Sequence, residues 1–81
     1  MKHDEIKTLI DKAWKTMTKR GIYPMPHMAH CLGSLKVGNK VLVISDNEVR
    51  IDTIERELFP ANKAGINEAI DAFISQIEDD Q

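Results

Sequence analysis

The chain has one cysteine, Cys31, among its 81 residues, so it forms no internal disulfide bond. A lone cysteine favours a reducing compartment. No stretch approaches the roughly 20 apolar residues of a membrane-spanning helix, and the opening segment MKHDEIK lacks the apolar run of a signal peptide. We therefore expect a cytoplasmic protein with no membrane segment.

Glycine is scarce, and its four residues form no phosphate-binding loop, because Gly33 and Gly38 are isolated and neither precedes a helix. Asp46, Asn47 and Glu48 lack the spacing of a calcium-binding loop. A chain this short also rarely encloses a ligand pocket of roughly 300 Å³ or more. These absences predict a protein that is not an enzyme and that holds no cofactor.

What the chain does contain is a helical pattern near each end. Apolar residues recur at spacings of three and four at Ile6, Leu9, Ile10, Ala13, Trp14 and Met17, and again at Ile66, Ala69, Ile70, Phe73, Ile74 and Ile77. Gly21 is suited to end the first helix, and Asn62 to cap the second. The patterns predict helices at about residues 4–20 and 62–78, with the aromatic residue of each stripe in the core.

The segment between these helices has the pattern of strands. Two prolines predict a loop over residues 21–31, and Gly38 with Asn39 predicts a hairpin turn. Strands are predicted at about residues 32–37, 40–45 and 48–55. The order predicts an α+β fold, a single domain over residues 1–81 of α-β-β-β-α order, with a three-stranded antiparallel meander and two helices packed on one face. Exposed strand edges in so small a domain also suggest a homodimer.

Charge is distributed unevenly along the chain. Residues 1–40 contain eight lysines and arginines against three acids, whereas residues 41–81 contain three against ten. The last predicted helix has five acids, Glu68, Asp71, Glu78, Asp79 and Asp80. Acids near the C-terminal end of a helix are mildly unfavourable, so helix stability does not explain them. Three explanations stay open: a solubilising tail, attraction to the basic first helix, or a surface that docks on a basic partner.

The predicted loop carries side chains suited to protein contact, namely Tyr23, Met25, His27 and Met28. Aromatic and methionine side chains that belong to no helical stripe are favoured at protein interfaces. Packing beneath the sheet edge is the alternative. The loop is therefore a second candidate surface for a partner.

His27, His30 and Cys31 are residue types that bind zinc, and a cysteine beside a histidine is also the pattern of a thiol nucleophile. The chain has no second pair of ligands across a long gap, and neighbouring residues of a strand point to opposite faces. No oxyanion-forming turn lies beside Cys31. We expect no metal site and no catalytic residue, and keep a metal- or thiol-dependent activity as the second alternative.

Four basic residues follow one another along the second half of the first helix, Lys12, Lys15, Lys19 and Arg20. Such a stripe can bind phosphates. The predicted element order is also that of double-stranded RNA-binding domains, but in the final helix Lys63 is followed by Glu68 and Asp71, which would repel phosphate. We assign no membership of that family, and keep nucleic-acid binding as the first alternative.

The leading hypothesis is a small non-enzymatic binding protein that acts by protein–protein contact. Its size and acidity are typical of inhibitors and regulators from bacteria, phages and mobile elements, whose targets include basic, nucleic-acid-binding proteins. This step is an analogy from size and charge, because no motif supports it.

Overall fold

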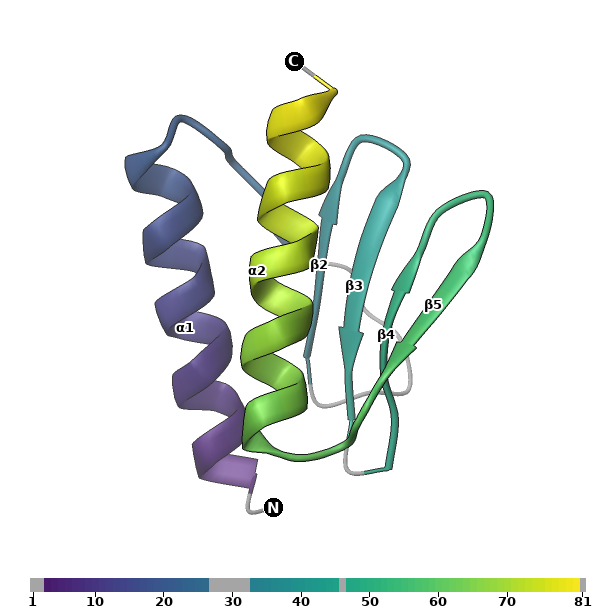
Figure 1. Ribbon diagram of the computed structural model, residues 1–81. Helices are drawn as coiled ribbons and strands as arrows, with labels where there is room; N and C mark the ends of the chain where they lie inside the picture. The colour runs from purple at the N-terminus through teal and green to yellow at the C-terminus, as the bar shows by residue number, and fades with distance from the viewer. Residues whose placement is uncertain (1–2, 27–32, 46, 81) are drawn as a thin grey trace.

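The computed structural model describes residues 3–26, 33–45 and 47–80. The helices within these ranges are α1 (His3–Lys19) and α2 (Lys63–Asp79), and the strands are β1 (Met25–Pro26), β2 (Gly33–Val37), β3 (Lys40–Ile44), β4 (Val49–Asp52) and β5 (Arg56–Phe59). The strands form one antiparallel sheet in the order β1-β2-β3-β4-β5, and both helices lie on the same face of it (Figure 1). The predicted α+β fold is confirmed.

The predicted number of strands is wrong. The third strand, predicted over residues 48–55, ends at Asp52, and the chain turns and returns as β5, with Asp52 opposite Arg56. The intervening Thr53, Ile54 and Glu55 include no glycine or proline, so the sequence offers no strong signal for this turn. The predicted loop also contains a short edge strand, because Met25 pairs with Lys36 of β2.

The first helix ends where the sequence predicts. Gly21 has a φ of 80°, and its N–H donates to the carbonyl oxygen of Thr18 at 3.1 Å, while the N–H of Ile22 donates to Met17 at 2.9 Å. These bonds satisfy two carbonyl groups in the last turn of α1 as the chain turns towards β1. The prediction that Trp14 lies in the core is wrong, because 37% of it is exposed on the helix flank.

The second helix begins with a capped and tightly packed first turn. Asn62 has extended backbone, and its side-chain oxygen accepts from the N–H of Gly65 at 2.8 Å, which confirms it as the N-cap. The N–H of Asn62 donates to the carbonyl oxygen of Pro60 at 2.9 Å. This loop lies so close to α2 that a Cβ atom on Gly65 would be 1.8 Å from that same oxygen.

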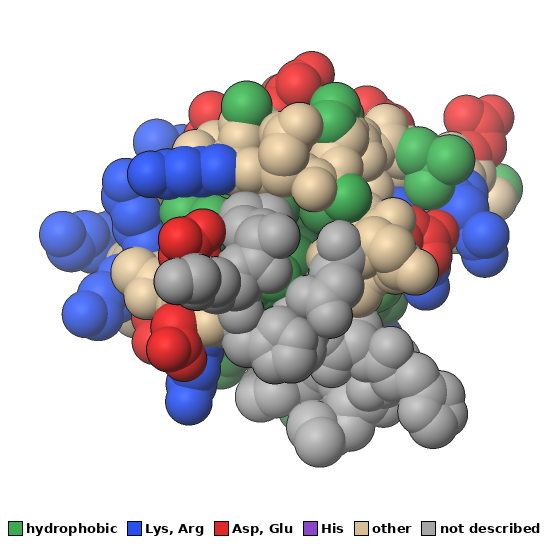
Figure 2. Space-filling model, turned by 90° about the horizontal axis from the view of Figure 1, so that it is seen from below, with side chains coloured by type: hydrophobic (Ala, Val, Ile, Leu, Met, Phe, Trp, Pro, Cys, Tyr) green, Lys and Arg blue, Asp and Glu red, His purple; other side chains and the backbone are tan. Residues whose placement is uncertain are grey.

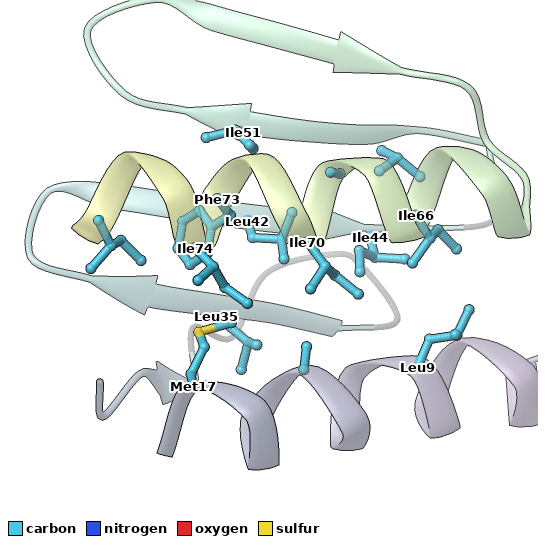
Figure 3. Close-up of a cluster of buried hydrophobic side chains, with 14 of the residues drawn as sticks. Leu9, Met17, Leu35, Leu42, Ile44, Ile51, Ile66, Ile70, Phe73 and Ile74 are labelled. Atoms are coloured by element: carbon cyan, nitrogen blue, oxygen red, sulfur yellow. The ribbon is translucent and has the colours of Figure 1, made fainter. Parts of the chain in front are cut away.

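One apolar core fills the space between the helices and the sheet (Figure 3). Phe73 of α2 is fully buried in it, as predicted, in one cluster with Leu42 of β3 and Ile51 of β4. On the sheet, alternate residues face this core, as the period of a strand requires. At Gly33 the Cδ1 atom of Ile10 occupies the space of a missing side chain, only 1.9 Å from where a Cβ would be.

Candidate functional site

A groove of about 610 Å³ opens at one end of the molecule, where three segments distant in sequence meet. These are the turn between β2 and β3, the turn between β4 and β5, and the C-terminal end of α2 (Figure 1). Its lining residues are Asn39, Lys40, Thr53, Ile54, Glu55, Gln76, Asp79 and Asp80. Its volume is about twice that of a groove of about 300 Å³ between the two helices, and we take it as the first candidate for a binding site.

Two turns of different kinds build the walls of this groove. Gly38 takes a φ of 62°, which allows the two-residue turn that the sequence predicts at Gly38 and Asn39. In the other turn, the N–H of Thr53 donates to the carbonyl oxygen of Glu55 at 2.9 Å, and the Thr53 hydroxyl accepts from the N–H of Glu55 at 3.2 Å. The residue between them, Ile54, is held at the tip with 98% of its surface exposed.

The groove is acidic. Lys40 forms an ion pair with Asp80, whereas the carboxylates of Glu55 and Asp79 have no ion pair with any described residue. The negative end of the α2 dipole lies here as well, and it adds to the potential of these carboxylates. Two acids without an ion pair beside a fully exposed isoleucine make a surface suited to a partner that is both basic and apolar.

The five acids that the sequence singled out on the last helix do not form one surface. Glu78 faces α1 and accepts from Arg20 at 2.7 Å, and Asp71 lines a separate groove of about 300 Å³ between the two helices. Asp79 and Asp80 line the large groove, and Glu68 is exposed elsewhere on α2. Of the three explanations left open for these acids, attraction to the basic first helix agrees with the Arg20–Glu78 ion pair at the end of α1, whereas Asp80 pairs with Lys40 of β3.

Of the loop residues predicted as a contact surface, Tyr23 and Met25 are exposed by 74% and 68%, so neither packs beneath the sheet edge. His27 and Met28 lie outside the described residues, as do the other two candidate metal ligands, His30 and Cys31. Within the described ranges, no group of three or more histidine, cysteine or acidic side chains is placed to hold a metal ion.

The basic residues of α1 lie on its exposed side. Lys12, Lys15 and Lys19 are exposed at helical spacings of three and four, so they share one face, whereas Arg20 is held by Glu78. Seen from the end at which α1 begins, lysine and arginine side chains gather along the side of the molecule that α1 occupies (Figure 2). In the described part of the chain, no helix is long and apolar enough to cross a membrane.

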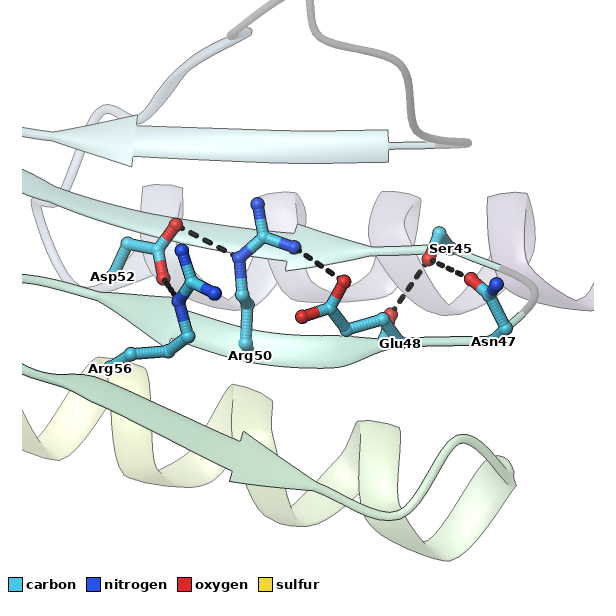
Figure 4. A network of polar contacts seen from close by, with 6 residues as sticks. All are labelled: Ser45, Asn47, Glu48, Arg50, Asp52 and Arg56. Atoms are coloured by element: carbon cyan, nitrogen blue, oxygen red, sulfur yellow. Dashed lines mark hydrogen bonds and ion pairs between the residues drawn. The ribbon is translucent and has the colours of Figure 1, made fainter.

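The sheet face opposite the helices carries a network of ion pairs (Figure 4). Arg50 donates to Asp52 at 2.9 Å and pairs with Glu48 at 2.8 Å, while Arg56 lies 3.5 Å from the other oxygen of Asp52. The hydrogen bond to Asp52 and the charges of both acids raise the pKa of Arg50, although burial opposes this shift. The network joins β4 to the start of β5 across this face of the sheet.

Sequence reasoning missed two features of the large groove, the exposed Ile54 and the carboxylate of Glu55, which has no ion pair with a described residue. Both were assigned to the end of the third predicted strand. The sequence carries only a weak signal for them, in that Ile54 interrupts the alternation of apolar and polar residues that runs through Val49 and Ile51.

Comparison of the chain with protein-family models, with curated proteins and with solved structures finds no match.

Proposed function

We propose that this protein is a small non-enzymatic binding protein that docks a basic segment of a partner protein in the acidic groove. One observation carries the proposal: Ile54, 98% exposed, stands at the rim of a groove in which the carboxylates of Glu55 and Asp79 have no ion pair within the described part of the chain. Binding hot spots commonly combine an apolar contact with charged groups around it. A target whose basic surface otherwise binds phosphate groups would be inhibited when it docks here.

The first prediction reverses the charge of the groove. A Glu55→Lys/Asp79→Lys variant is expected to lose the partner that the unmodified protein recovers from nuclease-treated extracts of its source cells. An Ile54→Ser variant is expected to weaken the same complex by about 2 kcal/mol, as for a typical hot spot. These residues are exposed, so the variants should unfold at nearly the same urea concentration as the unmodified protein.

A matched control has the same change of charge on another part of α2. Glu68→Lys/Asp71→Lys is expected to retain the partner, because neither residue lines the large groove. Recovery of the same proteins by the groove variant would contradict the proposal. Loss of the partner by the control alone would place the docking surface on the outer side of α2 instead.

The second candidate function is nucleic-acid binding by Lys12, Lys15 and Lys19, which share an exposed face of α1. It predicts that the material recovered from extracts is sensitive to nuclease. Changing these three lysines to glutamate should then abolish binding to duplex RNA at low salt, and the affinity of the unmodified protein should fall steeply as salt is added. Unchanged binding by that variant would remove this candidate.

A further inference from the structure

The outer edge of β5 has backbone groups that no other strand in the described part of the chain uses. β5 is the last strand of the sheet, so only one of its sides pairs with β4. The N–H of Thr53 donates to the carbonyl oxygen of Glu55, which makes Asp52 and Arg56 a non-hydrogen-bonded pair.

Because hydrogen bonding alternates along an antiparallel pair, the backbone groups of Glu57 and Phe59 bond to β4. The N–H and C=O groups of Arg56 and Leu58 then point outward, away from the sheet. An edge of this kind is a template for one more strand.

The side chains along this edge define what such a strand must contain. Leu58 lies on the sheet face opposite the helices and is 65% exposed, and Arg56 on the same face is engaged by Asp52. Glu57 lies on the helix face, where its carboxylate accepts from the side chain of Gln76 at 3.0 Å. Glu57 forms no ion pair with a described residue, so it would attract a basic side chain on the added strand.

A second copy of this chain is a poor occupant of the edge in the register that uses every outward group of Arg56 and Leu58. If the outward groups of Arg56 and Leu58 paired with Leu58 and Arg56 of a second copy, each Glu57 would lie directly opposite the other. The Cα atoms of such a non-hydrogen-bonded pair are about 4.5 Å apart, and like charges in that position are destabilising. Glu57 therefore favours a basic strand and disfavours self-pairing in that register.

We propose that the basic segment of the partner binds as an additional antiparallel strand on the outer edge of β5. This rests on the proposed function, and it names the form of the ligand: an extended segment in which apolar and basic residues alternate. Its apolar residues lie opposite Leu58 and Arg56 and form the backbone hydrogen bonds, while a lysine or arginine lies opposite Glu57. The strand continues past Glu55 to the groove, because β5 begins directly after the turn that carries Ile54.

An acetylated and amidated peptide of alternating valine and lysine is the probe. It is expected to bind the full chain, and to protect the amides of Arg56 and Leu58 from hydrogen exchange. N-methylation of its valines should abolish binding, since their N–H groups face β5. N-methylation of its lysines should have little effect, since those N–H groups face solvent. A peptide of alternating valine and glutamate should not bind.

Two variants of the protein complete the test. Leu58→Pro removes one outward N–H. The edge strand tolerates this change, because β4 does not use that group. The variant should bind the valine–lysine peptide about fivefold more weakly, or weaker still. Glu57→Lys should reverse the preference, so that the valine–glutamate peptide binds instead. Urea unfolding of both variants checks that they remain folded.

The edge proposal is overturned if the unmodified chain does not bind the valine–lysine peptide, or if Leu58→Pro or the N-methylated valines leave its affinity unchanged. These outcomes are distinct from failure of the proposed function. A partner from the extracts that is lost with Glu55→Lys/Asp79→Lys but kept by Leu58→Pro would retain the groove as the docking site and exclude strand addition.

Discussion

Replacement of Phe73 by alanine is expected to lower the free energy of unfolding by about 3–5 kcal/mol. Phe73 is fully buried at the centre of the core, in contact with a cluster that joins both helices to the sheet (Figure 3). The substitution removes a large apolar side chain and leaves a cavity that a rigid sheet and two packed helices cannot close. A domain of this size typically has a free energy of unfolding of about 5 kcal/mol, at the low end of the range for proteins, so the loss is comparable with the whole stability.

Urea unfolding followed by far-ultraviolet circular dichroism measures this effect. Phe73→Leu is the matched control, because it preserves most of the volume and should cost less than about 1.5 kcal/mol. If alanine and leucine at this position gave the same midpoint, Phe73 would not occupy the centre of the core.

Replacement of Gly65 by alanine is expected to destabilise the protein by about 1–3 kcal/mol or more, as overpacking does. Alanine is favoured over glycine inside a helix by about 1 kcal/mol, so helix propensity alone predicts the opposite sign. The steric clash outweighs helix propensity here, because the new Cβ would lie 1.8 Å from the carbonyl oxygen of Pro60. That oxygen also accepts from the N–H of Asn62, so the loop cannot move away without breaking this bond to the N-cap residue of α2.

Two control variants separate this clash from a general effect of substitution. Ser75→Ala lies on the exposed side of α2 and should change stability by less than about 0.5 kcal/mol. Gly33→Ala meets only the end of the flexible Ile10 side chain, which can change rotamer, so its cost should be smaller than that of Gly65→Ala. A stabilising Gly65→Ala would show that the loop before α2 is free to move.

The sequence predicts features that depend on residues close together in the chain, and it misses features that depend on contacts between distant segments. Asn62 is recognised as an N-cap because its bond to Gly65 spans three residues, and Gly38 is recognised because a tight turn needs a positive φ. The turn at Ile54 is missed because it contains ordinary residues. Its geometry depends on the pairing of β5 with β4, which no local signal encodes.

The acids of α2 show the same limit of prediction from sequence at the candidate site. Their number and order are visible in the sequence, but Glu78 and Asp80 acquire partners 58 and 40 residues away, at Arg20 and Lys40. Only the packing of α2 against α1 and the hairpins decides which of these acids form ion pairs with other described residues.

By itself the sequence determined the two helices, the glycine that ends the first and the asparagine that caps the second, because the 3.6-residue apolar period and the preferences of glycine and asparagine act over a few residues. Only the tertiary structure decided the fifth strand, the acidic groove around Ile54 and the outward-facing edge at Leu58. The physical reason is that each of these features depends on contacts between segments distant in the chain, and such contacts exist only after the core has brought those segments together.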